Sequence, residues 1–304
     1  MNKIIKLKKN PKLIVLFFMG KGILNWMNDK HYLKIKYRLM MGKKLNLINP
    51  KTYTEKLQWL KLYDRKKIYT TMVDKFEAKK YVSSIIGEEY IIPTLGIYNK
   101  FEEIDFNKLP NQFVMKCTHD SGGLVICKDK KTLDIKKAGK KIKKCLKRNY
   151  YYGGREWPYK NVKPRIIIEK YMVDESGTEL KDYKFFCFNG RVKFFKIDFD
   201  RFYKHRANYY TINKKILPFG EKQYPPQIDK KINMPNNLTK MIEIAEHLSQ
   251  TIDFVRIDFY EIDSKIFFGE ITFYPSSGFD KIEPEEWDKK IGDMLEISKG
   301  EMSK

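Results

Sequence analysis

The most informative part of the chain is FVRIDFY (residues 254–260), followed after a short polar connection by KIFFGEITF (residues 265–273). Side chains alternate between the two faces of a β-strand, so both segments have the pattern of strands and together predict an antiparallel hairpin. In the first segment Arg256, Asp258 and Tyr260 share one face. Glu270 and Thr272 share a face of the second, so the hairpin carries a polar patch among strongly apolar residues.

The register of this hairpin determines which polar groups meet. A three-residue loop over 263–265 would place Asp258 opposite Glu270 and Arg256 opposite Thr272. Neighbouring carboxylates repel each other unless a cation lies between them, and the hard ion Mg²⁺ prefers oxygen ligands of this kind. The hairpin alone leaves two interpretations open: a magnesium site, or an ordinary solvated face on which Arg256 neutralises the two acids.

The rest of the chain mixes helices and strands without a regular alternation, which predicts an α+β fold. Asn189-Gly190 lies between apolar segments and is a strong hairpin signal. Thr52 and Glu55 have capping-box spacing and predict the start of a helix that runs to Tyr63. Further strands are expected over 91–93, 113–116, 124–127, 165–169, 183–188 and 191–197, and further helices over 73–82, 133–148, 238–251 and 285–295.

A glycine-containing loop, Lys116-Cys-Thr-His-Asp-Ser-Gly-Gly123, connects two expected strands. It lacks the Walker pattern, but a Gly-rich turn can present backbone N–H groups to phosphate, and Lys116 can reach the same phosphates. The alternative is a flexible hairpin turn. Glu169 ends the strand over 165–169, where it would either contact the edge of a nucleotide base or simply meet solvent.

Composition narrows the function classes. Lys and Arg outnumber Asp and Glu by 61 to 38, a formal charge of +23, which favours an anionic partner unless it reflects a general preference for Lys. The four cysteines form no C-x-x-C pair and the four histidines are scattered, which argues against a zinc site and a disulfide framework. Reduced thiols favour a cytoplasmic location.

The N-terminal segment, residues 1–48, is basic and partly apolar. Its apolar run, residues 13–27, is shorter than the roughly 20 residues of a membrane-spanning helix, contains Lys21, and lacks the cleavage site of a signal peptide. A basic flank beside an apolar stretch with Trp26 fits a helix at the membrane interface, on the inner face of the plasma membrane. The alternative is a helix packed on the protein's own core.

These pieces occur in an order that resembles the ATP-grasp superfamily, and more closely its TupA-like branch, which is associated with teichuronopeptide, capsule and other surface polysaccharides. The resemblance runs from NPKTYTEKLQWLKLYDR (residues 49–65) to EITFYPSSGF (residues 270–279). Between them lie VDKFEAKKYV, VMKCTHDSGG, IIIEKYM, DYKFFCFNGR and VRIDFYEID. The resemblance implies two α+β subdomains, near 113–172 and 173–298, that grip ATP within a catalytic region over 49–300.

The resemblance also implies roles for individual residues. Lys75 and Lys116 resemble the two phosphate-binding lysines, ahead of a phosphate loop formed by His119, Asp120, Ser121, Gly122 and Gly123. Glu169 and Tyr171 resemble the hinge that holds adenine and ribose, and Lys184 adds charge near the phosphates. Asp258 and Glu270 resemble the magnesium carboxylates, and Arg256 the residue that steadies the transferring phosphoryl group. Thr272 stands where many ATP-grasp enzymes have Asn, as a third oxygen ligand for the metal.

The implied activity is that of an ATP- and Mg²⁺-dependent carboxylate–amine ligase that acts through an acyl phosphate. Its expected partners are a small amine or amino acid and an acidic saccharide polymer, with contact to acidic membrane. One alternative is a metal-dependent glycosyltransferase that uses the D-x-D pair Asp198 and Asp200. The other is a nucleic-acid binder, but the chain has no RNP or helix-turn-helix signature, so no nucleic-acid partner is expected.

Overall fold

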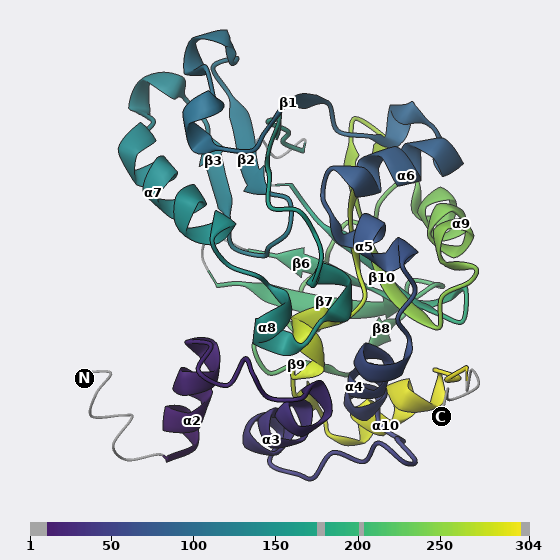
Figure 1. The fold of residues 1–304 in the computed structure, drawn as a ribbon. Helices are drawn as coiled ribbons and strands as arrows, with labels where there is room; N and C mark the ends of the chain where they lie inside the picture. The colour runs from purple at the N-terminus through teal and green to yellow at the C-terminus, as the bar shows by residue number, and fades with distance from the viewer. Residues whose placement is uncertain (1–10, 175–179, 201–203, 299–304) are drawn as a thin grey trace.

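The computed structural model describes residues 11–174, 180–200 and 204–298. Its larger sheet contains, at one edge, the hairpin over residues 254–272 that carries Asp258 and Glu270, called here the carboxylate hairpin (Figure 1). All neighbouring strands are antiparallel, and their order is β11-β10-β5-β6-β7-β8. The strands are β5 (Tyr183–Phe188), β6 (Arg191–Phe199), β7 (Arg206–Thr211), β8 (Ile216–Leu217), β10 (Phe254–Ile262) and β11 (Lys265–Thr272).

The register of the carboxylate hairpin is confirmed, although its turn differs from the expected one. Asp258 pairs with Glu270 and Arg256 with Thr272. The turn has two residues, Asp263 and Ser264, both at positive φ (48° and 57°), rather than three. A bulge at Gly269 adds the missing residue, because Phe259 pairs with Phe268 while Asp258 pairs with Glu270. The shorter turn and the bulge offset each other by one residue, so Asp258 lies opposite Glu270 as the sequence predicts.

The smaller sheet has the order β1-β4-β2-β3 and carries α7 (Ile135–Leu146) on one face (Figure 1). Phe113, Met115 and Ile142 form a separate apolar core between them. The strand expected over 91–93 is wrong: the strand starts only after Pro93, whose nitrogen has no hydrogen to donate to a ladder. The strands are β1 (Thr94–Tyr98), β2 (Phe113–Cys117), β3 (Leu124–Cys127) and β4 (Ile166–Lys170).

Helices surround the larger sheet and bury a mainly aromatic core against it, in which Phe185 stacks on Phe195 and Phe186 on Phe194. The capping box of Thr52 and Glu55 is present at the start of α4. The expected helix over 73–82 is split at Lys75, because Asp74 caps a new helix through the N–H groups of Phe76 and Glu77. The helices are α4 (Tyr53–Tyr63), α5 (Ile68–Val73), α6 (Glu77–Ile86), α8 (Tyr151–Gly154), α9 (Leu238–Ser249) and α10 (Glu286–Asp293).

Short elements complete the fold. A two-stranded sheet joins β9 (Gly220–Glu221) to β12 (Ile282–Glu283). Single 3₁₀ turns connect the longer elements; they are η1 (Glu88–Tyr90), η2 (Phe101–Glu103), η3 (Phe106–Lys108), η4 (Lys130–Thr132), η5 (Trp157–Tyr159) and η6 (Pro275–Gly278). The whole is an α+β fold, as the sequence predicts, and all four cysteines are free and buried.

The described part of the N-terminal segment forms α2 (Pro11–Gly20), an irregular connection over 21–28, and α3 (Asp29–Met41). α2 stands to one side of the molecule (Figure 1). The segment packs in part, since Met19 is buried, but Phe17, Phe18 and Trp26 leave 48%, 42% and 79% of their surface exposed. Among the helices that the structure describes, none has the length and apolar character needed to cross a membrane.

Candidate active site

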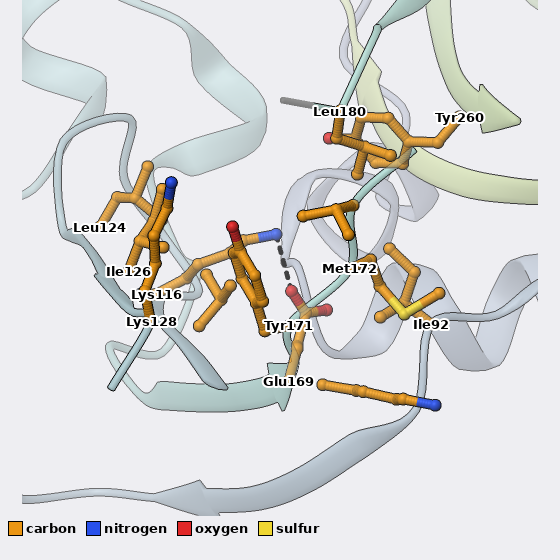
Figure 2. Close-up of a pocket in the computed structure, with 13 residues that line it drawn as sticks. Ile92, Lys116, Leu124, Ile126, Lys128, Glu169, Tyr171, Met172, Leu180 and Tyr260 are labelled. Atoms are coloured by element: carbon orange, nitrogen blue, oxygen red, sulfur yellow. Dashed lines mark ion pairs between the residues drawn. The ribbon is translucent and has the colours of Figure 1, made fainter. Parts of the chain in front are cut away.

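A cleft of about 170 Å³ lies between the two sheets. Leu124 and Ile126 of β3 leave 40% and 43% of their surface exposed in its wall, so the cleft offers apolar surface that the protein's own core does not cover. Such a surface suits a flat, largely apolar ring. The other apolar lining residues come from both sides of the cleft (Figure 2), namely Ile92, Val114, Tyr171, Met172, Val173, Leu180 and Tyr260.

Glu169 places a buried carboxylate at the edge of this cleft. One of its oxygens lies 2.6 Å from the Lys116 ammonium (Figure 2), and the other forms an ion pair with Lys79. Burial raises the pKa of the Glu169 carboxyl, but the charges of Lys116 and Lys79 outweigh it and lower that pKa to about 2. The expected hinge residue and the expected phosphate lysine are therefore in direct contact.

The loop after β2 is held in shape by its own aspartate. Oδ1 of Asp120 accepts hydrogen bonds from the backbone N–H groups of Gly122 (2.9 Å) and Gly123 (2.7 Å). A Cβ on Gly123 would lie 2.5 Å from Sγ of Cys117, so only glycine fits at this turn. The Lys75 ammonium donates to the Asp120 carbonyl at 2.7 Å, which brings the first expected phosphate lysine to the same loop.

The remaining loop residues point in different directions. His119 is 2% exposed, and its Nε2 lies 3.2 and 3.1 Å from the carbonyls of Cys145, in the last turn of α7, and Arg148, just after it, so the structure does not bring it into the cleft. Burial lowers the pKa of His119. Ser121 is exposed at the tip of the loop, with its side chain near Tyr150.

The polar face of the carboxylate hairpin is a compact charge cluster. Arg256 binds Asp258 through Nε and Nη2, both at 2.7 Å, and its Nη2 also reaches Glu270 at 2.9 Å and the Thr272 hydroxyl at 3.1 Å. Asp258 is 1% exposed and also accepts a hydrogen bond from Lys184 at 2.9 Å. Glu270 differs, because 45% of its side chain is exposed.

Lys184 extends this cluster into the sheet. It lies 2.8 Å from Asp182 and 3.4 Å from Asp198, as well as beside Asp258. Burial lowers the pKa of Lys184, but Asp258 and Asp198 outweigh it and raise that pKa above its ordinary value. Lys184 therefore balances buried carboxylates and is not an open phosphate contact.

The D-x-D pair has a different environment from the carboxylate hairpin. Asp198 is 3% exposed and lies beside the ammonium groups of Lys184 and Lys196 (3.6 Å) and the ring of His205 (3.2 Å). Asp200 pairs with Lys230 at 2.6 Å. The two carboxylates are thus neutralised separately by different cations.

Charges from the smaller sheet reach Glu270 across the cleft. Burial raises the pKa of the Glu270 carboxyl, but Arg256, Lys75, Lys184 and Lys116 together lower it to about 2. Lys116 belongs to β2 of the smaller sheet and Lys75 to the connection between α5 and α6, whereas Arg256 and Lys184 belong to the larger sheet. The charges of both expected phosphate lysines, Lys75 and Lys116, therefore act on Glu270, the expected metal carboxylate.

The hairpin offers donors that suit a hard cation. Two carboxylates and a hydroxyl, all oxygen ligands, face one another on adjacent strands, and Mg²⁺ prefers such ligands. In the described part of the chain the hydrogen bonds of Glu270 all involve Oε1, and 45% of its side chain is exposed. The described residues contain no cluster of three or more His, Cys, Asp or Glu that could hold a metal, so a cation here would need the Thr272 hydroxyl, water or phosphate oxygens as further ligands.

Two residues that contact the site, Lys79 and Arg148, were not predicted from the sequence. Lys79 is 7% exposed and donates to the Ile92 carbonyl as well as pairing with Glu169. Its position three residues before the buried Val82 on α6 was the available signal, since it puts a lysine on the apolar face of a helix. Arg148 binds Asp120 at 2.6 Å, and its place beyond a Lys-rich helix gave no such signal.

Solved structures with a similar fold are distant. A D-alanine–D-alanine ligase from Helicobacter pylori is 14% identical, with 81% of this chain and 70% of that chain covered and a TM-score of 0.43. A RimK domain ATP-grasp protein from Sphaerobacter thermophilus is 8% identical, with 77% and 70% covered and a TM-score of 0.42. A D-alanine–D-alanine ligase from Bacillus anthracis is 16% identical, with a TM-score of 0.37; 66% of this chain is covered, and the chain spans 57% of that ligase.

A search of curated proteins returned no match. The family model described as TupA-like ATPgrasp, in contrast, matches residues 55–296. That match includes both sheets, the loop after β2 and the whole carboxylate hairpin. The chain belongs to the TupA-like ATP-grasp family.

Proposed function

We propose that this protein is an ATP-dependent ligase that joins a carboxylate to an amine through an acyl phosphate. The observation that carries the proposal is the charge environment of Glu270, where Lys116 of the smaller sheet and Lys75 of the α5–α6 connection act on a carboxylate of the larger sheet. A polyphosphate needs cations from several directions, and a cleft between two sheets can supply them. The adjoining apolar cleft provides a place for the base.

In this proposal the nucleotide lies along the cleft from Tyr171 towards the loop after β2. The base packs against the exposed Leu124 and Ile126, and Glu169 contacts its polar edge or the ribose. Lys116 and Lys75 then face the phosphates as point charges. The N–H groups of Gly122 and Gly123 already donate to Asp120, so side-chain cations supply more of the phosphate binding than the backbone does.

The proposed reaction has two steps. An oxygen of the acceptor carboxylate attacks the γ-phosphorus of ATP, the bond from that phosphorus to the β,γ-bridging oxygen breaks, and ADP leaves with the electron pair. The nitrogen of the amine then attacks the acyl carbon, phosphate leaves, and the amine gives up a proton to solvent. Such transfers depend on positioning and charge neutralisation more than on a protein nucleophile. Arg256 is the residue proposed to stabilise the transferring phosphoryl group.

Magnesium is proposed as the cofactor. Glu270 and Asp258, with the Thr272 hydroxyl, would hold Mg²⁺, which when bound neutralises charge on the phosphates. Arg256 now occupies both Asp258 oxygens and one Glu270 oxygen, so Glu270 Oε2 is the ligand available without rearrangement.

The acceptor is proposed to be a carboxylate of an acidic cell-surface saccharide and the donor a small amine or amino acid. The excess of 61 basic over 38 acidic residues favours an anionic acceptor. The reaction is proposed to take place in the cytoplasm, with the chain held against the inner face of the plasma membrane by the exposed apolar residues of the N-terminal segment.

A thermal-shift titration tests the nucleotide part of this proposal. ATP with Mg²⁺ should raise the melting temperature of the full chain, because a ligand that binds only the folded state stabilises it by mass action. GTP and UDP-glucose, with the same Mg²⁺, are the comparison ligands. A folded protein that responds to UDP-glucose and not to ATP would contradict the ligase and favour a glycosyltransferase.

A further inference from the structure

A second cavity of about 590 Å³ lies beside the nucleotide cleft and shares no lining residue with it. Its size is in the range of ligand sites and exceeds that of the first cleft. Three separate parts of the chain form its walls: the N-terminal segment, residues 147–154 after α7, and Ser277 of η6. The N-terminal wall lies before the region matched by the family model, which begins at residue 55.

The cavity adjoins the place where phosphate chemistry is proposed. Arg148 lines it and binds Asp120 of the loop after β2 at 2.6 Å. Tyr150 also lines it, and its side chain lies near Ser121 at the tip of the same loop. Arg148 and Tyr150 therefore stand between the cavity and the loop, whose flanking residues Lys116 and Leu124 line the nucleotide cleft.

The lining of the cavity is strongly basic. Lys21, Lys36, Lys147 and Arg148 line it, and no Asp or Glu is among the described residues that do. The other side chains are amphipathic or polar: the rings of Tyr150 and Tyr152, and the groups of Asn25, Asn149 and Ser277. Met19 is the one aliphatic side chain among the described lining residues, so the cavity suits a hydroxyl-rich anion better than a lipid chain.

Buried hydrogen bonds position the walls of this cavity. Lys61 is fully buried and donates to the carbonyls of two lining residues, Gly154 (2.8 Å) and Ser277 (2.7 Å). Arg155 is 1% exposed, and its Nη2 donates to the carbonyls of Leu24, Asn25 and Met27 at 3.0 to 3.2 Å. These contacts hold the N-terminal wall against residues 150–155 without using the cations that face the cavity.

We infer that this cavity is the acceptor site and that it binds an acidic saccharide through the carboxylates of its sugar units, with the N-terminal segment forming one wall. The inference rests on the proposed ligase function and assigns its acceptor a place. Lys21, Lys147 and Arg148 attract the carboxylates, and the tyrosine rings and amide groups contact the sugar rings and hydroxyls. Bound in this way, a carboxylate beside Arg148 and Tyr150 lies on the side of the cavity nearest the loop after β2.

Two double variants test the inference at equal net charge. Lys21→Glu/Lys147→Glu changes exposed lysines that line the cavity, and Lys34→Glu/Lys144→Glu changes exposed lysines of α3 and α7 that do not. Fluorescence anisotropy with labelled trigalacturonate should show at least a tenfold weaker affinity for the cavity variant and less than a threefold change for the control. Lys21→Glu and Lys147→Glu should each weaken binding several-fold alone.

The outcomes separate this inference from the ligase proposal. An equal loss of trigalacturonate affinity in the two double variants would mean non-specific attraction and would overturn the acceptor site. If ATP still raised the melting temperature of those samples, the proposed ligase function would not be affected. Trigalacturonate binding that depends on the cavity, without any ATP-induced shift in the unmodified chain, would reject the ligase and keep an anion site. If triglutamate competed with labelled trigalacturonate as well as unlabelled trigalacturonate does, the assignment to a saccharide would be overturned. If Lys21→Glu alone did not change the affinity, the N-terminal segment would not be part of the site.

Discussion

At the scale of single residues, the candidate site depends on which charges are exposed and which are buried. Lys116 has a 25% exposed side chain, and Glu270 is 45% exposed, whereas Asp258 and Lys184 are buried in mutual contact. Exposed charges can change partner when a ligand arrives, but a buried pair that loses one member leaves an uncompensated charge. Similar replacements at these positions should therefore have different effects on stability.

Lys116→Ala should lower ADP release by roughly 10²-fold or more, because one cation directed at the phosphates is lost. The fold should persist, since Glu169 keeps Lys79 as its partner. Turnover measured with saturating ATP and melting temperature measured without it separate the two effects. Lys193→Ala, at an exposed position of β6, is the matched control and should leave both unchanged. Wild-type turnover in Lys116→Ala would mean that the nucleotide lies elsewhere.

Glu270→Gln and Asp258→Asn should differ in their effect on the stability of the fold, although each removes one carboxylate from the same cluster. Glu270→Gln should abolish the Mg²⁺-dependent part of the ATP-induced thermal shift at nearly unchanged melting temperature. Asp258→Asn should in addition destabilise the fold by about 3–5 kcal/mol, because Arg256 and Lys184 lose a buried counter-charge. Urea unfolding without ligand measures this difference. Equal stability of the two variants would show that the Asp258 ion pairs are not needed for folding.

At the scale of elements, Glu169 connects three of them: it lies in β4, pairs with Lys116 of β2 and pairs with Lys79 of α6. The pKa of Glu169 is lowered from about 4.5 to about 2, because its two lysines outweigh the effect of burial. A carboxyl whose pKa is lower in the folded state stabilises the fold above its unfolded pKa. That stabilisation is lost as the pH falls from about 5 towards 2.

The free energy of unfolding should therefore fall across this pH range, and Glu169→Gln should make the fall shallower. The lowered pKa corresponds to about 3 kcal/mol at neutral pH. Urea titrations of the wild type and Glu169→Gln at several pH values provide the measurement, with Glu103→Gln, an exposed carboxylate, as the control. Parallel curves for Glu169→Gln and wild type would contradict the assigned ion pairs.

The carboxylate hairpin, β1 and the loop at His119 show which features can be predicted from the sequence and which cannot. Alternation predicted both strands of the carboxylate hairpin and the pairing of Asp258 with Glu270, but not the two-residue turn and the Gly269 bulge, because no glycine marks the turn. β1 was missed because its strand pattern is short and follows a proline. The direction of His119 depends on contacts with residues 145 and 148, which alternation along one strand does not encode.

At the scale of the whole molecule, the N-terminal segment is held by contacts far away in sequence. Arg155 donates to carbonyls of residues 24, 25 and 27, and Tyr32 donates to the Gly153 carbonyl. Local patterning in residues 13–27 left open whether this stretch packs on the core or lies on a membrane. The described structure shows it packed through Met19, with aromatic rings still exposed on its outer side.

Phe17→Ser/Phe18→Ser/Trp26→Ser should lower binding to vesicles rich in phosphatidylglycerol by at least tenfold, because interfacial binding combines buried apolar area with attraction to anionic lipid. Vesicle sedimentation measures the bound fraction. Ile48→Ser is the control, since Ile48 is 97% exposed and lies outside the apolar run over residues 13–27. Neutral phosphatidylcholine vesicles should bind the wild type weakly, and equal sedimentation of all three proteins would contradict the membrane contact.

The hydrogen bonds from Gly122 and Gly123 to Asp120 also have a thermodynamic consequence. Because these bonds and the ion pair with Arg148 already order the loop, the proposed binding of a nucleotide beside it would cost the loop backbone little conformational entropy. The entropy lost on binding would then come mainly from the long side chains of Lys75 and Lys116, the proposed phosphate contacts.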